Sequence, residues 1–237
     1  MNNNLAKYIL VLMVSLLLAE NTQGQSAQRS PIKEFLFHHN DSLHYAQEHP
    51  FRWGELAVPV AMMGAGIAIY EIDPLYENTD LRLRDALQAD GHASFQIEDY
   101  AQYAPIAFVP IFKLCGAESR HGWRDLINLA AGSYLIGSLA QNITKFSVWR
   151  ERPNGSDLQT SFPSGHTFTA FTGAEILRRE YGRDYPIIPI VGYTIATGVG
   201  FMRVYNNKHW ASDVLAGAGL GILSASVMYW LAPYLRF

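Results

Sequence analysis

Ser161-Phe162-Pro163-Ser164-Gly165-His166-Thr167 is the most informative stretch of this 237-residue chain. It is followed by an unbroken run to Arg178, and a proline ahead of a serine is typical of a helix start with serine at the N-cap. The free N–H groups and the positive dipole end of such a helix favour a phosphate-like anion. Gly165 lets the backbone approach that anion closely because it carries no Cβ. His166 then lies in the first turn, where a proton donor is useful, although a capped helix with a surface histidine fits this stretch equally well.

A basic cluster precedes this stretch. Lys145 and Arg152 lie seven residues apart, so both project from one face if the segment is helical, and Pro153 ends or redirects that helix. Arginine offers a planar fork of donors to phosphate oxygens, whereas lysine acts as a compact point charge. A solvated basic helix end is the alternative for this cluster taken alone.

A third cluster follows downstream, where Met202-Arg203 precedes His209 and Asp213. The histidine and the aspartate stand at i and i+4, so they are neighbours on one face of a helix. The carboxylate can accept the proton of one ring nitrogen and leave the other nitrogen free to attack. Arg203 supplies a third cation. We therefore expect the three clusters to meet in one anion site.

The pattern Lys-x6-Arg-Pro, Pro-Ser-Gly-His and Arg-x5-His-x3-Asp resembles the type 2 phosphatidic acid phosphatase family, which shares its site with the vanadium haloperoxidases. The resemblance covers roughly Leu126 to the C-terminus, and the combined motif is highly specific. One departure is visible, because Met202 stands where the family usually has serine. That change affects a supporting interaction and leaves the catalytic groups in place.

The resemblance implies a mechanism that uses neither metal nor cofactor. His209 is then the nucleophile that forms a phosphohistidine, Asp213 orients it, and His166 protonates the leaving oxygen. The groups that the resemblance assigns to phosphate binding are Lys145, Arg152, Ser164, Gly165 and Arg203. Water then hydrolyses the phosphoenzyme.

The composition favours a membrane protein or an unusually apolar helical bundle. Hydrophobic residues make up 49% of the chain and charged residues only 16%, well below the usual quarter of a soluble domain. The net charge of -3 gives no sign of nucleic-acid binding. A single cysteine, Cys115, excludes an internal disulfide.

The N-terminus has the pattern of an export signal. Lys7 precedes the apolar run Tyr8–Ala19, and small residues before Gln25 suit a cleavage site. We expect residues 1–24 to be a signal peptide or, alternatively, an uncleaved anchor. Residues 25–237 then form one phosphatase-like domain, with its motif core at about 126–237.

Apolar segments recur along the rest of the chain and predict an all-α bundle of about five to six apolar helices, transmembrane like those of the family it resembles. Gly217 and Gly221 form a GxxxG pair that lets two helices approach closely. The predicted segments are Leu56–Tyr70, Ala104–Ala117, Leu126–Ala140, Phe168–Leu177, Ile187–Val204 and Val214–Leu231.

Basic residues in two connections predict the orientation in the membrane. Arg120 and Arg124 lie in one connection and Arg178, Arg179 and Arg183 in another, and the positive-inside rule places both in the cytoplasm. The three motif clusters then lie together on the exterior or periplasmic side. A cleaved signal conflicts with this arrangement if Leu56–Tyr70 crosses the membrane, so we expect that segment to be short and non-crossing or re-entrant.

The sequence thus predicts a membrane phosphatase acting on a lipid phosphate or pyrophosphate, with no protein partner. The resemblance suggests lipid A, undecaprenyl pyrophosphate, phosphatidylglycerol phosphate and phosphatidic acid as substrates, and an outward-facing site favours the first two. A soluble, exported acid phosphatase of the same superfamily is the main alternative. A haloperoxidase would usually be a longer chain. A non-catalytic binding protein conflicts with the complete set of motif residues.

Overall fold

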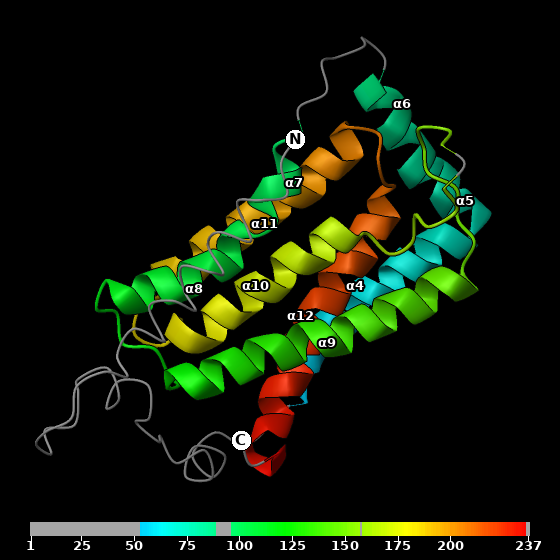
Figure 1. Ribbon diagram of the computed structural model, residues 1–237. Coiled ribbons are helices and arrows are strands. Elements are labelled where there is room, and N and C mark those ends of the chain that lie inside the picture. Colours follow the sequence, from blue (N-terminus) through cyan, green and yellow to red (C-terminus); the bar gives the residue numbers. More distant parts are fainter. Residues whose placement is uncertain (1–52, 89–95, 157, 236–237) are drawn as a thin grey trace, which may run out of the picture. The chain divides into compact units, whose positions relative to one another are not determined.

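The computed structural model describes residues 53–88, 96–156 and 158–235, and these residues form helices and no β-strand, which confirms the all-α prediction (Figure 1). Each predicted apolar segment forms one helix. The six helices are α4 (Gly54–Glu71), α8 (Ala104–Leu114), α9 (Trp123–Ser147), α10 (Gly165–Tyr181), α11 (Ile187–Tyr205) and α12 (Ala211–Leu235). The expected signal or anchor at residues 1–24 lies outside the described residues.

Short helical segments connect the longer helices on the side of the motifs. They are α5 (Asp73–Tyr76), the π-helical segment η1 (Glu77–Leu81), α6 (Arg82–Gln88) and α7 (Glu98–Ala101). Pro74 in the first turn of α5 suits the start of a helix, because its missing N–H would have no partner there. These segments bring acidic side chains to the end of the bundle where α10 begins.

Helix α10 is the central element of the bundle. It contacts α8, α9, α11 and α12, and its residues Ala170 to Leu177 are all buried. Apolar side chains around it form the core, including Val109 of α8, Leu129 of α9 and Met228 of α12. This burial on all sides fixes the direction of α10, and therefore the position of its first turn.

Two glycines allow α12 to pack directly on the first turns of α10. A Cβ at Gly217 would lie 2.6 Å from the Ser164 carbonyl oxygen, and one at Gly221 would lie 2.6 Å from the Phe168 carbonyl oxygen. No other residue fits at these distances without moving the backbone. The GxxxG pair therefore provides the close approach predicted from the sequence.

Helix α4 runs antiparallel to α12 along its length. A Cβ at Gly66 would lie 2.7 Å from the Ser212 carbonyl oxygen, and a Cβ at Gly219 would lie 2.6 Å from the Pro59 carbonyl oxygen. Glu55 at one end of α4 contacts the last turn of α10, while Tyr70 at the other end stacks near the start of α10. Helix α4 thus runs the length of α10, and the expectation that this segment is non-crossing or re-entrant stays a prediction.

By length and hydropathy, α11 and α12 can each cross a membrane. Helix α4 and the segment Asp73–Gln88 meet the same criterion only as a pair bent by 101°. Six apolar segments were predicted. Among the described residues, only two helices qualify as spans, or three spans if the bent pair counts as one. Helix α8 has only 11 residues, and α9 and α10 carry charged side chains such as Lys145 and Glu175.

Candidate active site

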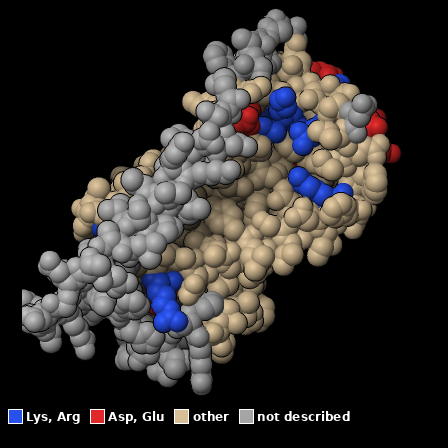
Figure 2. Space-filling view, viewed as in Figure 1, with Lys and Arg blue, Asp and Glu red and all other residues tan. Residues whose placement is uncertain are grey.

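The three sequence clusters meet at the end of the bundle where α10 begins. The Ser164 backbone N–H donates to the Asp213 carbonyl oxygen at 3.0 Å, which ties the central cluster to the downstream one. A Cβ at Gly165 would lie 3.8 Å from Lys145 Nζ, which places the upstream cluster against the same turn. Figure 2 shows basic side chains gathered there with acidic ones beside them. The predicted convergence is therefore present.

The first turn of α10 has the expected start but a different cap. Ser164 occupies the N-cap position in an extended conformation, after a cis peptide bond between Phe162 and Pro163. Its side chain is fully buried and does not cap the helix, because its hydroxyl accepts a hydrogen bond from Thr167 Oγ1 at 2.9 Å. Gly165 and His166 are half-buried, so this turn remains accessible to a ligand.

The helical face predicted for Lys145 and Arg152 is wrong. Helix α9 ends at Ser147, so Lys145 lies in its last turn and Arg152 lies in the following connection. That connection is fixed by the hydrogen bond from Ser161 N to Arg150 O at 3.0 Å. Because the connection folds back over the start of α10, Arg152 still reaches the site, where its charge acts on Lys145 and His209.

Two arginines at the site carry buried donors without a protein acceptor. Among the described residues, the Nε atoms of Arg152 and Arg203 are buried and make no hydrogen bond. A buried donor without an acceptor costs roughly 1–3 kcal/mol, and more when the group is charged. An anion with several oxygens can supply the missing acceptors to both guanidinium groups. This pair of unsatisfied donors is the clearest local indication of an anion site.

His209 lies at the bottom of the site. It is 2% exposed and precedes the first residue of α12, so it does not occupy the helical position that its spacing from Asp213 suggested. Its Nδ1 lies 3.5 Å from Asp213 Oδ2 and 3.5 Å from Ser161 Oγ. These contacts are longer than strong hydrogen bonds, and such contacts commonly tighten when a ligand binds. With Nδ1 facing Asp213, Nε2 is the nitrogen available for attack.

Asp213 is held by more groups than the sequence indicated. Its Oδ2 accepts hydrogen bonds from Ser161 Oγ at 2.5 Å and from the Trp210 backbone N–H at 2.9 Å. Its Oδ1 accepts from Arg150 Nη1 at 2.5 Å. The carboxylate is therefore fixed in position before any ligand arrives, which suits a group that orients a histidine.

Arg150 is a residue of the site that the sequence did not reveal. It is 5% exposed, bridges Asp213 and Asp80 (Nη2 to Oδ2, 2.7 Å), and lies 4.5 Å from the ring centroid of Tyr70. No periodic pattern links Arg150 to Asp80, 70 residues earlier. Its donors point to two carboxylates, so Arg150 supports Asp213 and contributes no free donor to an anion.

A second set of unpredicted residues comes from α7. Asp99 Oδ1 lies 2.8 Å from His166 Nε2 and 3.3 Å from Arg203 Nη1. Its neighbour Glu98 is buried, lies 3.4 Å from Arg203 Nη1, and accepts a hydrogen bond from Asn206 at 2.7 Å. The only sequence signal was the acid-rich character of Glu71–Tyr100, which gave no specific partner.

The two histidines have lowered pKa values. Burial is the main cause that lowers the pKa of His209 to about 4; the charges of Arg203 and Arg152 act in the same direction, and Asp213 opposes them. Burial, then Arg203, also lowers the pKa of His166 below its ordinary 6.5, while Asp99 opposes the shift. His209 is therefore neutral at neutral pH, as a nucleophile requires.

No group of three or more His, Cys, Asp or Glu side chains suited to a metal ion occurs in the described part of the chain. The expectation that the reaction needs no metal or cofactor remains a prediction.

Known proteins are similar to this chain over many more residues than the three motif clusters. The model of the PAP2 superfamily matches residues 126–237. Lipid A 1-phosphatase of Porphyromonas gingivalis is 38% identical over 159 residues, which are 65% of this chain and 35% of that protein. Bacitracin transport permease protein BcrC of Bacillus licheniformis is 32% identical over 108 residues, 44% of this chain and 50% of that protein. The chain thus spans between a third and a half of the length of these relatives.

A solved structure shares the fold. It is the first transmembrane PAP2 type phosphatidylglycerolphosphate phosphatase from Bacillus subtilis, with a TM-score of 0.52 and 19% identity, covering 78% of this chain and 100% of that chain. The match over residues 126–237 contains all three motif clusters. The resemblance inferred from those clusters is confirmed, and residues 126–237 of this chain match the PAP2 superfamily.

Proposed function

We propose that this protein is a phosphatase that removes a phosphate group from a membrane lipid phosphate or pyrophosphate. The observation that carries the proposal is the pair of buried, unsatisfied Nε donors of Arg152 and Arg203 beside a buried, neutral His209. A phosphoryl group needs this combination of cations for its oxygens and a nucleophile for its phosphorus. The name of the P. gingivalis relative, lipid A 1-phosphatase, is consistent with such an activity.

In the proposed reaction, His209 Nε2 attacks phosphorus, a P–N bond forms and the P–O bond to the leaving group breaks. Asp213 faces Nδ1 and stabilises the positive charge that develops on the ring. His166 donates its proton to the leaving oxygen. Lys145, Arg152, Arg203 and the first turn of α10 neutralise the three remaining oxygens. Water then attacks the phosphohistidine, which releases phosphate and restores neutral His209.

The substrate that we favour is an envelope lipid, lipid A or undecaprenyl pyrophosphate. The 38% identity to a protein named lipid A 1-phosphatase supports lipid A. Helices α11 and α12, which are long and apolar enough to cross a membrane, support a site that meets its substrate at a bilayer surface.

We also propose that the site faces the periplasm or the cell exterior. Arg178 and Arg179 lie in the last turn of α10, whereas Gly165 and His166 lie in its first turn. The motif residues and the basic residues are therefore at opposite ends of one helix. The positive-inside rule assigns the basic end to the cytoplasm. In this orientation α4 begins at the cytoplasmic end, because Glu55 pairs with Arg179 at 2.9 Å.

A soluble, exported acid phosphatase is the second candidate. It is favoured by the observation that α8 is short and that neither α9 nor α10 meets the criterion for a span. Low charge content and the apolar surfaces of α11 and α12 favour the membrane protein.

The test is phosphate release by the full chain in detergent with a chelator present. The panel is lipid A, undecaprenyl pyrophosphate, phosphatidic acid and a soluble aryl phosphate. We expect strong preference for one lipid. Equal or faster release from the soluble ester would favour the exported acid phosphatase, and release only after a metal ion is restored would contradict the histidine mechanism.

A further inference from the structure

A chain of buried charged side chains leads from His209 to the segment between α4 and α6. The two oxygens of the Asp213 carboxylate face different groups. Its Oδ2 lies 3.5 Å from His209 Nδ1, whereas its Oδ1 accepts a hydrogen bond from Arg150 Nη1 at 2.5 Å. The other terminal nitrogen of Arg150, Nη2, donates to Asp80 Oδ2 at 2.7 Å. Contacts therefore run without a break from Asp80, through Arg150, to the carboxylate that faces His209.

Asp80 is held on both of its oxygens. It comes from the π-helical segment η1 and is 1% exposed. Its Oδ1 accepts a hydrogen bond from the Ser212 backbone N–H at 3.0 Å, and its Oδ2 contacts the Ser212 hydroxyl as well as Arg150. Ser212 is the second residue of α12, where backbone N–H groups lack a partner within the helix and the helix dipole favours an anion. Asp80 thus caps the start of α12, directly beside Asp213.

Arg150 is enclosed by aromatic rings as well as by carboxylates. Its guanidinium carbon lies 4.5 Å from the ring centroid of Tyr70, 5.8 Å from that of Tyr76 and 5.4 Å from that of Trp210. The rings add cation–π attraction and leave Arg150 only 5% exposed to water. Charges act strongly on one another in such surroundings, so the loss of one carboxylate changes how Arg150 acts on the other.

The network carries one more negative than positive charge, because Asp80 and Asp213 share the single guanidinium of Arg150. Arg150 therefore fixes Asp213 without cancelling its negative charge. When His209 bonds to phosphorus, its ring becomes a cation that needs a compensating anion nearby. The two carboxylates then face two cations, and the charges of the network balance.

We propose that Asp80 is a positioning residue for phosphoryl transfer, acting through Arg150 on the Asp213 carboxylate. This inference rests on the proposed function, because only a ring that becomes positive needs the extra negative charge. Asp80 holds Nη2 of Arg150, so that Nη1 fixes Asp213 in place while Asp213 keeps its charge for His209. The contacts of Asp80 are with Arg150 and Ser212, neither of which belongs to the anion-binding set, so its effect on the reaction is indirect.

The first experiment compares Asp80→Asn with the unmodified full chain in detergent, with the soluble aryl phosphate as substrate. Rapid quench over a range of substrate concentrations gives the maximal rate of His209 phosphorylation and the concentration at which that rate is half-maximal. We expect the maximal rate to fall at least about tenfold and the half-maximal concentration to change less than about twofold. The reason is that charge develops on the ring only as the P–N bond forms, after the substrate has bound.

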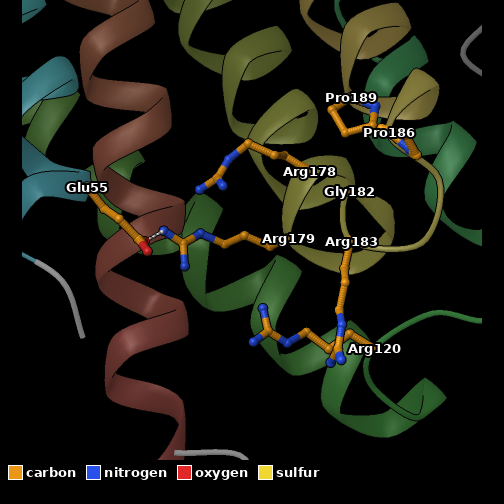
Figure 3. Close-up of a pocket in the computed structure, with 8 residues that line it drawn as sticks. All are labelled: Glu55, Arg120, Arg178, Arg179, Gly182, Arg183, Pro186 and Pro189. Atoms are coloured by element: carbon orange, nitrogen blue, oxygen red, sulfur yellow. Dashed lines mark hydrogen bonds and ion pairs between the residues drawn. The ribbon is translucent and has the colours of Figure 1, made fainter. Parts of the chain in front are cut away.

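The matched control is Glu175→Gln, which changes a buried carboxylate elsewhere in α10. Glu175 is also 1% exposed, and it accepts hydrogen bonds from Arg178 at 2.6 and 2.7 Å and from Arg179 at 2.7 Å. Figure 3 shows these two arginines, which lie in the last turn of α10, at the end remote from the motifs. Both variants remove a buried negative charge beside arginine, so both should lower the melting temperature. Only Asp80→Asn should slow the phosphorylation of His209.

The second experiment tests whether Asp80 acts through Arg150. Lysine keeps the positive charge but replaces the planar fork with a single nitrogen, so it does not bridge the two carboxylates as arginine does. Arg150→Lys alone should slow phosphorylation at least about tenfold, which tests the network even where Asp80→Asn fails to fold. In the Arg150→Lys background, Asp80→Asn should slow it by less than about threefold more, because the two residues act as one unit. A further tenfold loss in the double variant would show that Asp80 acts independently of Arg150 and would overturn the proposal.

The outcomes separate this inference from the proposed function. Phosphorylation of His209 that is slower in Asp80→Asn and unchanged in Glu175→Gln supports both. Phosphorylation at the same rate in Asp80→Asn and the unmodified protein overturns this inference and leaves the proposed function intact. An equal loss of rate in Glu175→Gln also overturns it, since the effect would then reflect destabilisation in general. No phosphohistidine in the unmodified protein would contradict the proposed reaction, and this inference with it.

Discussion

At the scale of a single residue, burial determines the protonation state of His209. Burial and the neighbouring charges of Arg203 and Arg152 disfavour a proton on the ring and lower its pKa to about 4, so the imidazole is neutral at neutral pH. Asp213 acts in the opposite direction and favours the protonated ring, but burial outweighs it and the pKa of His209 stays low. The residue is therefore prepared to attack phosphorus without first losing a proton to solvent.

The pH dependence of kcat/KM follows from the two histidine pKa values. His209 must be neutral, so the acid limb should lie near its pKa of about 4. His166 must be protonated, and its pKa lies below 6.5, so activity should fall as pH rises through that lower value. We expect an acidic optimum in a soluble aryl phosphate assay. An acid limb near 6.5, the ordinary value for histidine, would contradict the assignment of His209.

Asp99 gives a more specific prediction. Its carboxylate contacts His166 Nε2 and favours the protonated ring, so Asp99→Asn should move the alkaline limb of the pH profile to lower pH. The rate at the optimum should fall by no more than about tenfold, because a partly exposed ion pair contributes roughly 1 kcal/mol or less.

The control for this variant is Asp125→Asn, in the first turn of α9 at the far end of the bundle. It should leave the pH profile unchanged. If Asp99→Asn changed the rate without moving the alkaline limb, a positioning role through His166 would be wrong.

At the level of the helices, packing of α12 on α10 depends on small residues. A Cβ at Gly221 would lie 2.6 Å from the Phe168 carbonyl oxygen and 2.9 Å from the Thr172 nitrogen. Backbone atoms cannot rotate away as a side chain can. Gly221→Ala should therefore destabilise the protein by about 1–3 kcal/mol, as measured by thermal unfolding in detergent.

Gly198→Ala is the matched control, because a Cβ there meets nothing within 4 Å. This change in α11 should be neutral or stabilising by up to about 1 kcal/mol, since alanine is the better helix former. Equal loss in both variants would show that the effect reflects glycine removal in general and not contact between α10 and α12.

The six longer helices α4 and α8 to α12 were predictable, because each contains most or all of one predicted apolar segment. The motif residues were also predictable, since their spacing is short and characteristic. The contacts from α7 and η1 were not: Asp99 meets His166 across 67 residues, and Asp80 meets Arg150 across 70. No local pattern encodes such ion pairs. The path of α4 along α10 was not predictable either, because only the contacts of α4 with both ends of α10 show it.

For the whole molecule, the proposed orientation can be tested with the chain's one cysteine. Cys115 is exposed and lies at the end of α8, close to the connection that carries Arg120. In the proposed orientation it faces the cytoplasm. A membrane-impermeant maleimide should therefore label Cys115 in inside-out vesicles and not in intact spheroplasts.

The matched variant moves the cysteine to the other end of the bundle. Asn154 is exposed in the connection that carries Arg152, so Asn154→Cys in a Cys115→Ser background should be labelled in spheroplasts. Labelling of Cys115 from the outside, with Asn154→Cys labelled only from the inside, would reverse the proposed orientation.

The proposed reaction requires the three clusters to act as one site with His209 as the nucleophile. The most direct measurement is to quench the enzyme during turnover of a radiolabelled phosphate ester and map the phosphorylated residue by peptide mass spectrometry. We predict an acid-labile, alkali-stable phosphate on His209 that is absent in His209→Ala, a variant that should remain folded. A phosphate on any other residue, or normal turnover by folded His209→Ala, would contradict it.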